Sequence, residues 1–187
     1  MEDKALETLR IFLARRGLPT DTQRVVAEHV EKVNLYSIGK VLIIFSQKDK
    51  IVSNDLSVFA KFVATTTYNS GVIVVTLSKP SENTLITMKG MSTAGYHFFH
   101  IRELQYDVTQ HRMVPPHRIL KPDEVTELMK AKNISNPEAQ LLSIDSQDIQ
   151  ARVLGAKPGD VIEVLRHSDT AGQTKVWRYC LADVNIA

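Results

Sequence analysis

The sequence predicts two domains, an α/β domain followed by a smaller α+β domain that ends in a β-hairpin. In the first part of the chain, amphipathic helical patterns alternate with continuous aliphatic runs such as residues 41–45, which are typical of strands covered on both faces. In the second part, proline-led helices precede two strand patterns joined by a polar loop. We place the boundary at residue 104, which gives domains 1–104 and 105–187.

Residues 2–16 form the first predicted helix, because their apolar residues recur on one helical face. These residues are Ala5, Leu6, Leu9, Phe12 and Leu13. The pattern stops at residues 17–19 (Gly-Leu-Pro), where glycine suits a left-handed cap and proline blocks continuation. Thr20 or Asp21 can cap a second helix, which we expect to run to about Val33.

The rest of the first domain alternates strands with helices. Strands are predicted at residues 40–46, 71–77 and 96–101, and helices at residues 53–63 and 81–91. Because helices connect these strands, we expect neighbouring strands to be parallel.

The second domain has shorter elements. Residues 104–108 are a short strand candidate, and residues 114–117 must be extended because each proline moves its predecessor out of helical geometry. The remaining predicted elements are helices at 122–132, from Pro137 and at 148–154, a turn at Pro158-Gly159, and hairpin strands at 161–166 and 175–184.

Composition places the chain among ordinary globular proteins. It has 187 residues, of which 43% are hydrophobic and 24% charged, so disorder is not expected. Its apolar runs are too short to cross a bilayer and its first residues lack the layout of a signal peptide, so we expect a soluble, intracellular protein with no membrane contact. Residues 1–105 hold 13 Lys/Arg against 10 Asp/Glu, whereas the remainder holds 10 against 11. Any contact with nucleic acid is therefore expected in the first half.

No residue pattern predicts catalysis, a metal or a cofactor. His111 and His117 are separated by five residues that include two prolines, and no cysteine lies nearby to complete a zinc site. Ser168 and Thr170 stand beside a histidine and an aspartate, but adjacency in sequence is not triad geometry. The glycines are scattered, without a phosphate-binding pattern.

Residues 111–117 (His-Arg-Met-Val-Pro-Pro-His) resemble the His-x-x-Val-Pro-x-His segment of the shared fifth subunit of nuclear RNA polymerases and of its homologue in archaeal RNA polymerase. Further segments that resemble this family follow in the same order. They are residues 124–128, 148–155, 159–162, 166–172 and 177–178.

The chain departs from the family pattern at four positions. His167 and Asp169 stand where the closing motif has proline and glutamate, and Ile149 stands where proline usually follows Asp148. Lys121 stands at a helix cap that is usually Thr or Ser, a loss of about 1 kcal/mol that the following proline can offset.

The resemblance implies a non-catalytic structural subunit of a multisubunit DNA-directed RNA polymerase, monomeric within a hetero-oligomer. The first half resembles the N-terminal jaw domain of the nuclear subunit in layout, which implies an endonuclease-like fold without the catalytic acids. The archaeal homologue lacks this domain, so the resemblance favours a nuclear enzyme, or a viral factory or virion if a large DNA virus encodes it. The C-terminal domain is implied to dock on the largest subunit, with the jaw near downstream double-stranded DNA, which it contacts weakly and without sequence preference.

Two sets of residues are candidates for these contacts. The partner-binding set is His111, Val114, Pro115, His117, Arg152, Arg166, Ser168, Thr170, Gly172 and Arg178. The DNA-proximal set is Lys48, Lys50, Lys61 and Lys79. The three arginines can either anchor an interface or brace the hairpin internally, and both roles stay open.

Two other functions remain as alternatives. Residues 151–164 also fit a generic β-barrel pattern, as in small dimeric DNA-binding transcription regulators. A nuclease built on the first sheet is the second alternative, but residues 75–79 offer hydroxyls where a metal-binding carboxylate is needed.

Overall fold

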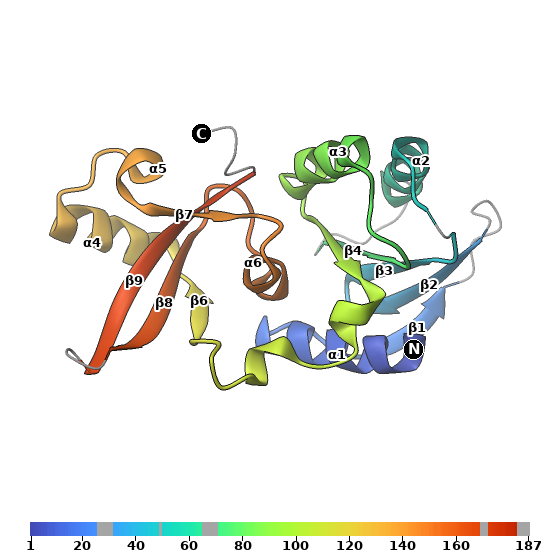
Figure 1. Ribbon diagram of the computed structural model, residues 1–187, viewed down its shortest axis with the longest axis horizontal. Coiled ribbons are helices and arrows are strands. Elements are labelled where there is room, and N and C mark those ends of the chain that lie inside the picture. The colour runs from blue at the N-terminus through green and yellow to red at the C-terminus, as the bar shows by residue number, and fades with distance from the viewer. Residues whose placement is uncertain (26–31, 49, 65–70, 169–171, 183–187) are drawn as a thin grey trace. The chain divides into compact units, whose positions relative to one another are not determined.

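The computed structural model describes residues 1–25, 32–48, 50–64, 71–168 and 172–182. The chain folds as two compact units, the N-terminal unit (Met1–Asp107) and the C-terminal unit (Val108–Ala187), each with its own sheet (Figure 1). In the part of the chain that is described, no helix is long and apolar enough to span a bilayer.

The N-terminal unit is a five-stranded sheet between two layers of helices (Figure 1). Its strands lie in the order β1 (Thr22–Val25), β2 (Val33–Ile38), β3 (Val41–Ser46), β4 (Val72–Thr76) and β5 (Tyr96–His100). Strands β3, β4 and β5 are parallel, as predicted from the alternating pattern. Helix α1 (Glu2–Arg15) covers one face, and α2 (Ser53–Ala64) and α3 (Glu82–Ser92) cover the other.

The predicted helix from residue 20 to Val33 is wrong where the structure describes it. Residues 22–25 form β1, which pairs antiparallel with β2, and residues 26–31 lie outside the described part. Thr22 and Val25 are β-branched residues that suit a strand. Strand β2 offers an edge with which these residues pair, and Arg10 Nε donates a hydrogen bond to Thr22 Oγ1 (2.7 Å). Local propensity does not predict such contacts.

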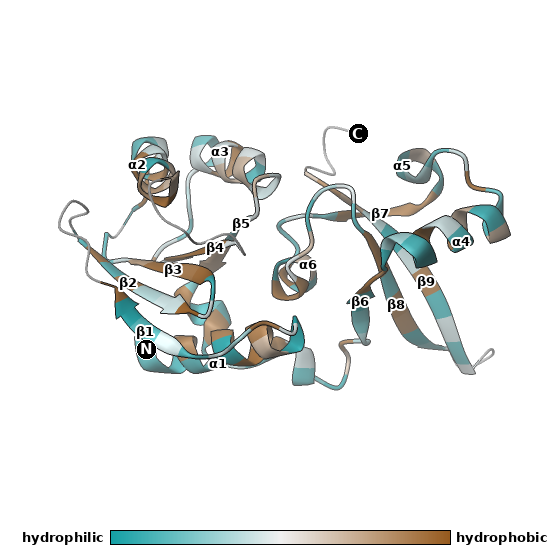
Figure 2. Ribbon diagram, turned by 180° about the vertical axis from the view of Figure 1, so that it is seen from behind, coloured by the Kyte–Doolittle hydropathy of each residue, from teal (hydrophilic) through white to brown (hydrophobic). Residues whose placement is uncertain are grey.

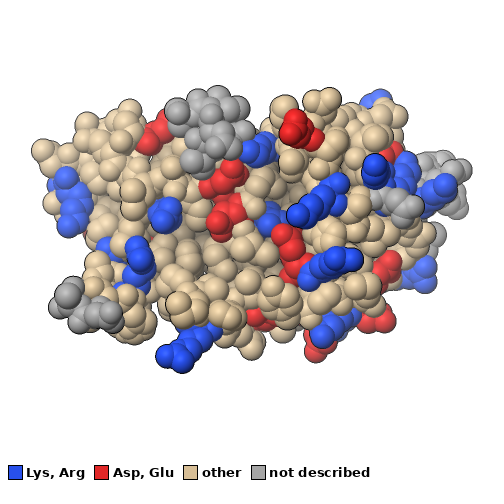
Figure 3. Space-filling view, in the orientation of Figure 1, with Lys and Arg blue, Asp and Glu red and all other residues tan. Residues whose placement is uncertain are grey.

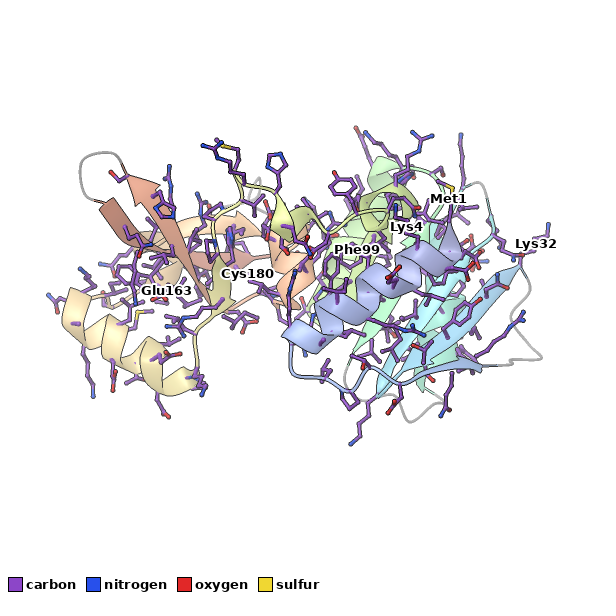
Figure 4. All side chains as sticks on the ribbon, turned by 90° about the horizontal axis from the view of Figure 1, so that it is seen from below. Met1, Lys4, Lys32, Phe99, Glu163 and Cys180 are labelled. Atoms are coloured by element: carbon purple, nitrogen blue, oxygen red, sulfur yellow. The ribbon has the colours of Figure 1, made fainter. Side chains whose placement is uncertain are left out.

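Aliphatic residues of the central strands form the core of this unit, as the brown β3 and β4 of Figure 2 show. On the α1 side, Phe12 and Phe99 are fully buried with ring centroids 6.3 Å apart, and Figure 4 shows Phe99 beside α1. The Arg15 guanidinium donates to both carboxylate oxygens of Asp107, at 3.1 and 2.5 Å. This pair ties the end of α1 to the end of the unit.

The strand candidate at residues 104–108 is also wrong, because the chain here forms two 3₁₀ turns, η1 (Ile101–Leu104) and η2 (Val108–Gln110). The His100 ring accepts from the Arg102 N–H (3.2 Å), and the Glu103 carboxylate accepts from the His100 N–H (2.8 Å). These two bonds satisfy backbone donors at the end of β5 and turn the chain out of the sheet.

The C-terminal unit is a four-stranded sheet with a helix on each face. Its strands are β6 (His117–Ile119), β8 (Val161–Ser168), β9 (Gly172–Leu181) and β7 (Leu142–Asp145), in that order across the sheet. Its helices are α4 (Pro122–Lys132), α5 (Pro137–Gln140) and α6 (Ile149–Leu154). The three helices, the Pro158-Gly159 turn and the closing hairpin were predicted and are confirmed, whereas β7 was not predicted.

Alternate residues of β8 and β9 build two small cores, one on each face of this sheet. Ile162, Val164 and Cys180 pack with residues of α6. Val161 packs on the opposite face with Leu128 of α4. Helix α6 therefore covers part of one face of the sheet, and α4 covers part of the other.

Lys121 is the N-cap residue of α4, and it has no side-chain oxygen to accept from the first N–H groups of the helix. The Glu124 carboxylate accepts from the Lys121 N–H at 2.8 Å, which supplies half of a capping box. Lys121→Thr should supply the other half and raise the free energy of unfolding of this unit by about 1 kcal/mol. Urea unfolding followed by the fluorescence of Trp177, the single tryptophan, measures this change.

Lys130→Thr, in the last turn of the same helix, is the matched control and should give no gain. An unfolding midpoint for Lys121→Thr no higher than that of Lys130→Thr contradicts this account of the cap.

Candidate docking groove on the C-terminal unit

The hairpin of β8 and β9 is longer than the strands beside it. Strand β6 pairs only with residues 162–164, and β7 only with residues 178–181. Residues 165–168 of β8 therefore extend past β6, and residues 172–177 of β9 extend past β7, as the long arms of Figure 1 show. Side chains here alternate between the two faces of the sheet, so Val164 and Arg166 share the face that α6 partly covers.

A cavity of about 370 Å³ opens on this face, next to α6. Its lining comes from the residues before and in β6, the start of α6, β7 and both arms of the hairpin. The lining residues are Pro115, His117, Ile144, Asp148, Gln150, Val164, Arg166, Val176 and Arg178. The cavity thus combines an aliphatic base with a charged rim, and its volume lies at the small end of the range of ligand pockets in proteins. We call it the groove.

The extended segment at residues 114–117, which contains two prolines, forms one wall of the groove through Pro115 and His117. Pro116 O accepts from the Leu165 N–H at 3.0 Å, which holds the segment against β8. His117 Nδ1 lies 2.6 Å from Pro115 O, and since a carbonyl only accepts, Nδ1 carries the proton and donates. In the neutral ring His117 Nε2 is then an acceptor that is not used by this bond.

The three candidate arginines have different environments. Arg152 is only 8% exposed, which favours the internal role. Arg178 is half-buried and donates from Nη1 to Ser143 O at 2.8 Å, so it braces β7 against β9 while lining the groove. Arg166 is exposed on the rim, and its side chain makes no hydrogen bond or ion pair with the described residues. The structure therefore presents Arg166 outward, where the sequence left its role open.

The other predicted partner residues that the structure describes lie outside the groove lining. His111 is exposed in the turn after η2, where its Nδ1 accepts from the Met113 N–H and its carbonyl from the Val114 N–H. Ser168 pairs with Gly172 at the end of the hairpin, where Gly172 has a φ of +69° that suits glycine. Thr170 lies outside the described residues.

Sequence reasoning missed five of the lining residues, namely Ile144, Asp148, Gln150, Val164 and Val176. Asp148 was noted only as part of the resemblance, and in the structure its Oδ1 caps α6 by accepting from the Gln150 N–H at 2.8 Å. The alternation of residues 162, 164 and 166 was the one signal that placed Val164 beside Arg166. The others meet only in the folded unit.

The four candidate DNA-proximal lysines also differ. Lys48 forms an ion pair with Asp55 of α2, whose carboxylate also accepts from the Val52 N–H at 3.1 Å. Burial alone would raise the pKa of Asp55, but these hydrogen bonds and the charge of Lys48 hold it below its ordinary value. Lys48 is thus engaged within its own unit, whereas Lys50, Lys61 and Lys79 are exposed. Basic and acidic side chains are interspersed on the face that Figure 3 shows.

The cysteine of the chain, Cys180, is fully buried in the core beneath the groove. Burial, with the negative charges of Asp160, Asp145 and Asp148, raises the pKa of its thiol to about 12. The thiol is therefore protonated and inaccessible at neutral pH. Within the described residues, no group of three or more metal-ligating side chains comes together.

This burial gives a direct test of the folded C-terminal unit. Native protein should stay unlabelled by a maleimide at pH 7.5 over a period in which the urea-unfolded protein is fully labelled, because only opening of the core exposes the thiolate. Mass spectrometry of the intact chain measures the label. Equal labelling rates with and without urea contradict the placement of Cys180.

The chain is similar to one family of known proteins. Residues 106–180 match the family described as RNA polymerase Rpb5, C-terminal domain. Subunit rpabc1 of DNA-directed RNA polymerases I, II and III from Dictyostelium discoideum is 27% identical, over 94% of this chain and 80% of its own length. DNA-directed RNA polymerase subunit Rpo5 of Thermofilum pendens is 43% identical over 40% of this chain and 90% of its own length. The same subunit of Sulfurisphaera tokodaii is 38% identical over 43% of this chain and 93% of its own length.

The two archaeal relatives each match less than half of this chain but nearly all of themselves, whereas the Dictyostelium relative matches almost the whole chain. The family match, residues 106–180, contains every residue that lines the groove. The chain belongs to the Rpb5 family of DNA-directed RNA polymerase subunits.

Proposed function

We propose that this protein is a non-catalytic scaffold of its polymerase, and that the C-terminal unit docks on the largest subunit through the groove. The observation that carries this proposal is the groove itself, where predicted partner residues line a cavity with an aliphatic base. Concave surfaces of this kind, with a few polar groups at the rim, are where partner side chains are buried.

The N-terminal unit is proposed to act as a jaw near downstream DNA. Three exposed lysines and a small excess of basic residues in the first half of the chain support this role. Such a surface attracts phosphates without gripping them. Because a relative named for polymerases I, II and III matches almost the whole chain, we propose a nuclear location and a place in more than one polymerase.

Affinity purification from native extract tests the docking proposal. Tagged full-length chain and a fragment that begins at residue 105 should both recover the largest polymerase subunit, whereas residues 1–104 alone should not. Recovery of the polymerase by the N-terminal fragment alone would show that the division of labour is wrong.

A nuclease assay tests the absence of catalysis. Purified chain with Mg²⁺ should leave double-stranded DNA intact. Cleavage that a single acidic substitution abolishes would refute the scaffold role in favour of the nuclease alternative.

A further inference from the structure

The charged side chains that line the groove differ in whether they have hydrogen-bond partners within the unit. Two arginines line it against one carboxylate. The Asp148 carboxylate already accepts from the Gln150 N–H, and Arg178 already donates to Ser143 O. Arg166 is the lining cation whose side chain has no partner among the described residues. The guanidinium of Arg166 is therefore the charged group of the groove that is available to bind an anion.

The aliphatic part of the groove lies at a fixed spacing from this cation. Val164 precedes Arg166 by two positions on β8, and Val176 is paired directly with Val164 on β9. Residues two apart on a strand project to the same face about 7 Å from one another. An extended peptide has the same spacing between its own alternate side chains, so it can match both features at once.

We infer that the groove binds an extended acidic segment of the largest polymerase subunit, in which an Asp or Glu pairs with Arg166 while an aliphatic residue two positions away lies on Val164 and Val176. This inference rests on the proposed docking function. The flat fork of the guanidinium donates two parallel hydrogen bonds to a carboxylate, which fixes the acidic residue in place. The aliphatic residue then loses its water shell against the base of the groove.

A nucleic-acid phosphate is the competing anion, and the lining disfavours it. Ile144, Val164 and Val176 offer no side-chain hydrogen-bond donor to a sugar or phosphate. A phosphate also needs several donors, while Arg178 Nη1 and His117 Nδ1 already donate within the unit. The acidic peptide uses both the charge and the aliphatic base.

Site-specific cross-linking identifies the occupant. Thr174 pairs with Arg166 across the hairpin and is exposed, so photoreactive benzoylphenylalanine at this position, in full-length chain assembled into polymerase, lies beside the proposed acid. The expected product is a peptide of the largest subunit that contains an Asp or Glu two residues from an aliphatic residue. Attachment to DNA or RNA, or to a peptide without this pair, overturns the inference.

Charge reversal then measures the contribution of Arg166. Arg166→Glu should lower recovery of the largest subunit by about tenfold or more, and Lys130→Glu, the same charge change on α4, should not. Changing the cross-linked acid to arginine should restore recovery of Arg166→Glu. Cys180 protection confirms that each variant is folded.

The outcomes separate the two proposals. If wild-type chain recovers no polymerase, the docking function and this inference both fail. If wild-type chain recovers polymerase and Arg166→Glu does so equally well, the docking function stands and the acidic occupant is refuted.

Discussion

Val176→Trp is expected to reduce recovery of the largest polymerase subunit by about tenfold or more, because the indole fills the base of the groove and displaces the partner. Val176 lines a cavity of about 370 Å³, so one large side chain occupies much of it. The change is measured by affinity purification of tagged full-length chain from native extract, with the recovered subunit quantified by mass spectrometry.

Lys175→Trp is the matched control for this substitution. Lys175 precedes Val176 on β9 and its side chain projects to the opposite face, where it pairs with Glu163 at 3.4 Å. It adds the same indole to the same strand without entering the groove, so recovery should match that of the wild type. Equal losses for both variants would show that the hairpin tolerates no tryptophan, and equal recovery would show that the groove is not the docking site.

Phe12→Ala is expected to destabilise the N-terminal unit by about 3–5 kcal/mol, the usual cost of removing a buried phenylalanine side chain. Phe12 is fully buried against Phe99, and a loss of this size is a large part of the stability of a small domain. Protease cleavage within residues 1–107 and the helical signal in circular dichroism report this loss. Ile11→Ala, at the preceding position of α1 where the side chain is 36% exposed, should cost far less.

The same variant tests whether the two units are independent. The urea transition reported by Trp177 should be unchanged in Phe12→Ala, and recovery of the polymerase should persist, because the fluorophore and the groove both lie in the C-terminal unit. Loss of the Trp177 transition together with that of the N-terminal unit would show that the C-terminal unit depends on its neighbour for stability.

The sequence predicts the elements that carry a strong local signal. The run from Val41 to Phe45 is apolar on both faces and forms nearly all of the central strand β3. Pro122 opens α4, and Gly155 ends α6 with a φ of +77°. In each case the residues themselves limit the backbone to one conformation, through packing, a fixed φ or a left-handed cap.

The elements that the sequence did not predict correctly are determined by residues elsewhere in the fold. Residues 22–25 become a strand because β2 offers an unpaired edge, and β7 forms because β9 offers the edge that faces away from β8. Neither partner is visible from a local window. The chain turns just before residues 104–108 because the ring of His100 and the carboxylate of Glu103 accept hydrogen bonds from the N–H groups of Arg102 and His100.

The residues of the candidate site could likewise be predicted from the sequence only in part. Pro115, His117, Arg166 and Arg178 could be selected from the resemblance, and the structure brings all four to one cavity. The sequence could not show that Arg152 is buried or that Lys48 forms an ion pair with Asp55. Whether a charged side chain faces a partner or its own fold depends on neighbours that are distant in sequence.

Hydroxyl-radical footprinting of the chain, free and assembled in purified polymerase, tests the docking surface most directly. The partly exposed groove residues Pro115, His117 and Val176 should be oxidised in the free chain and protected in the assembled enzyme, while exposed Ile86 of the N-terminal unit serves as the reference side chain. Protection confined to residues 1–107, with the groove residues equally oxidised in both states, would contradict a C-terminal groove as the point of attachment.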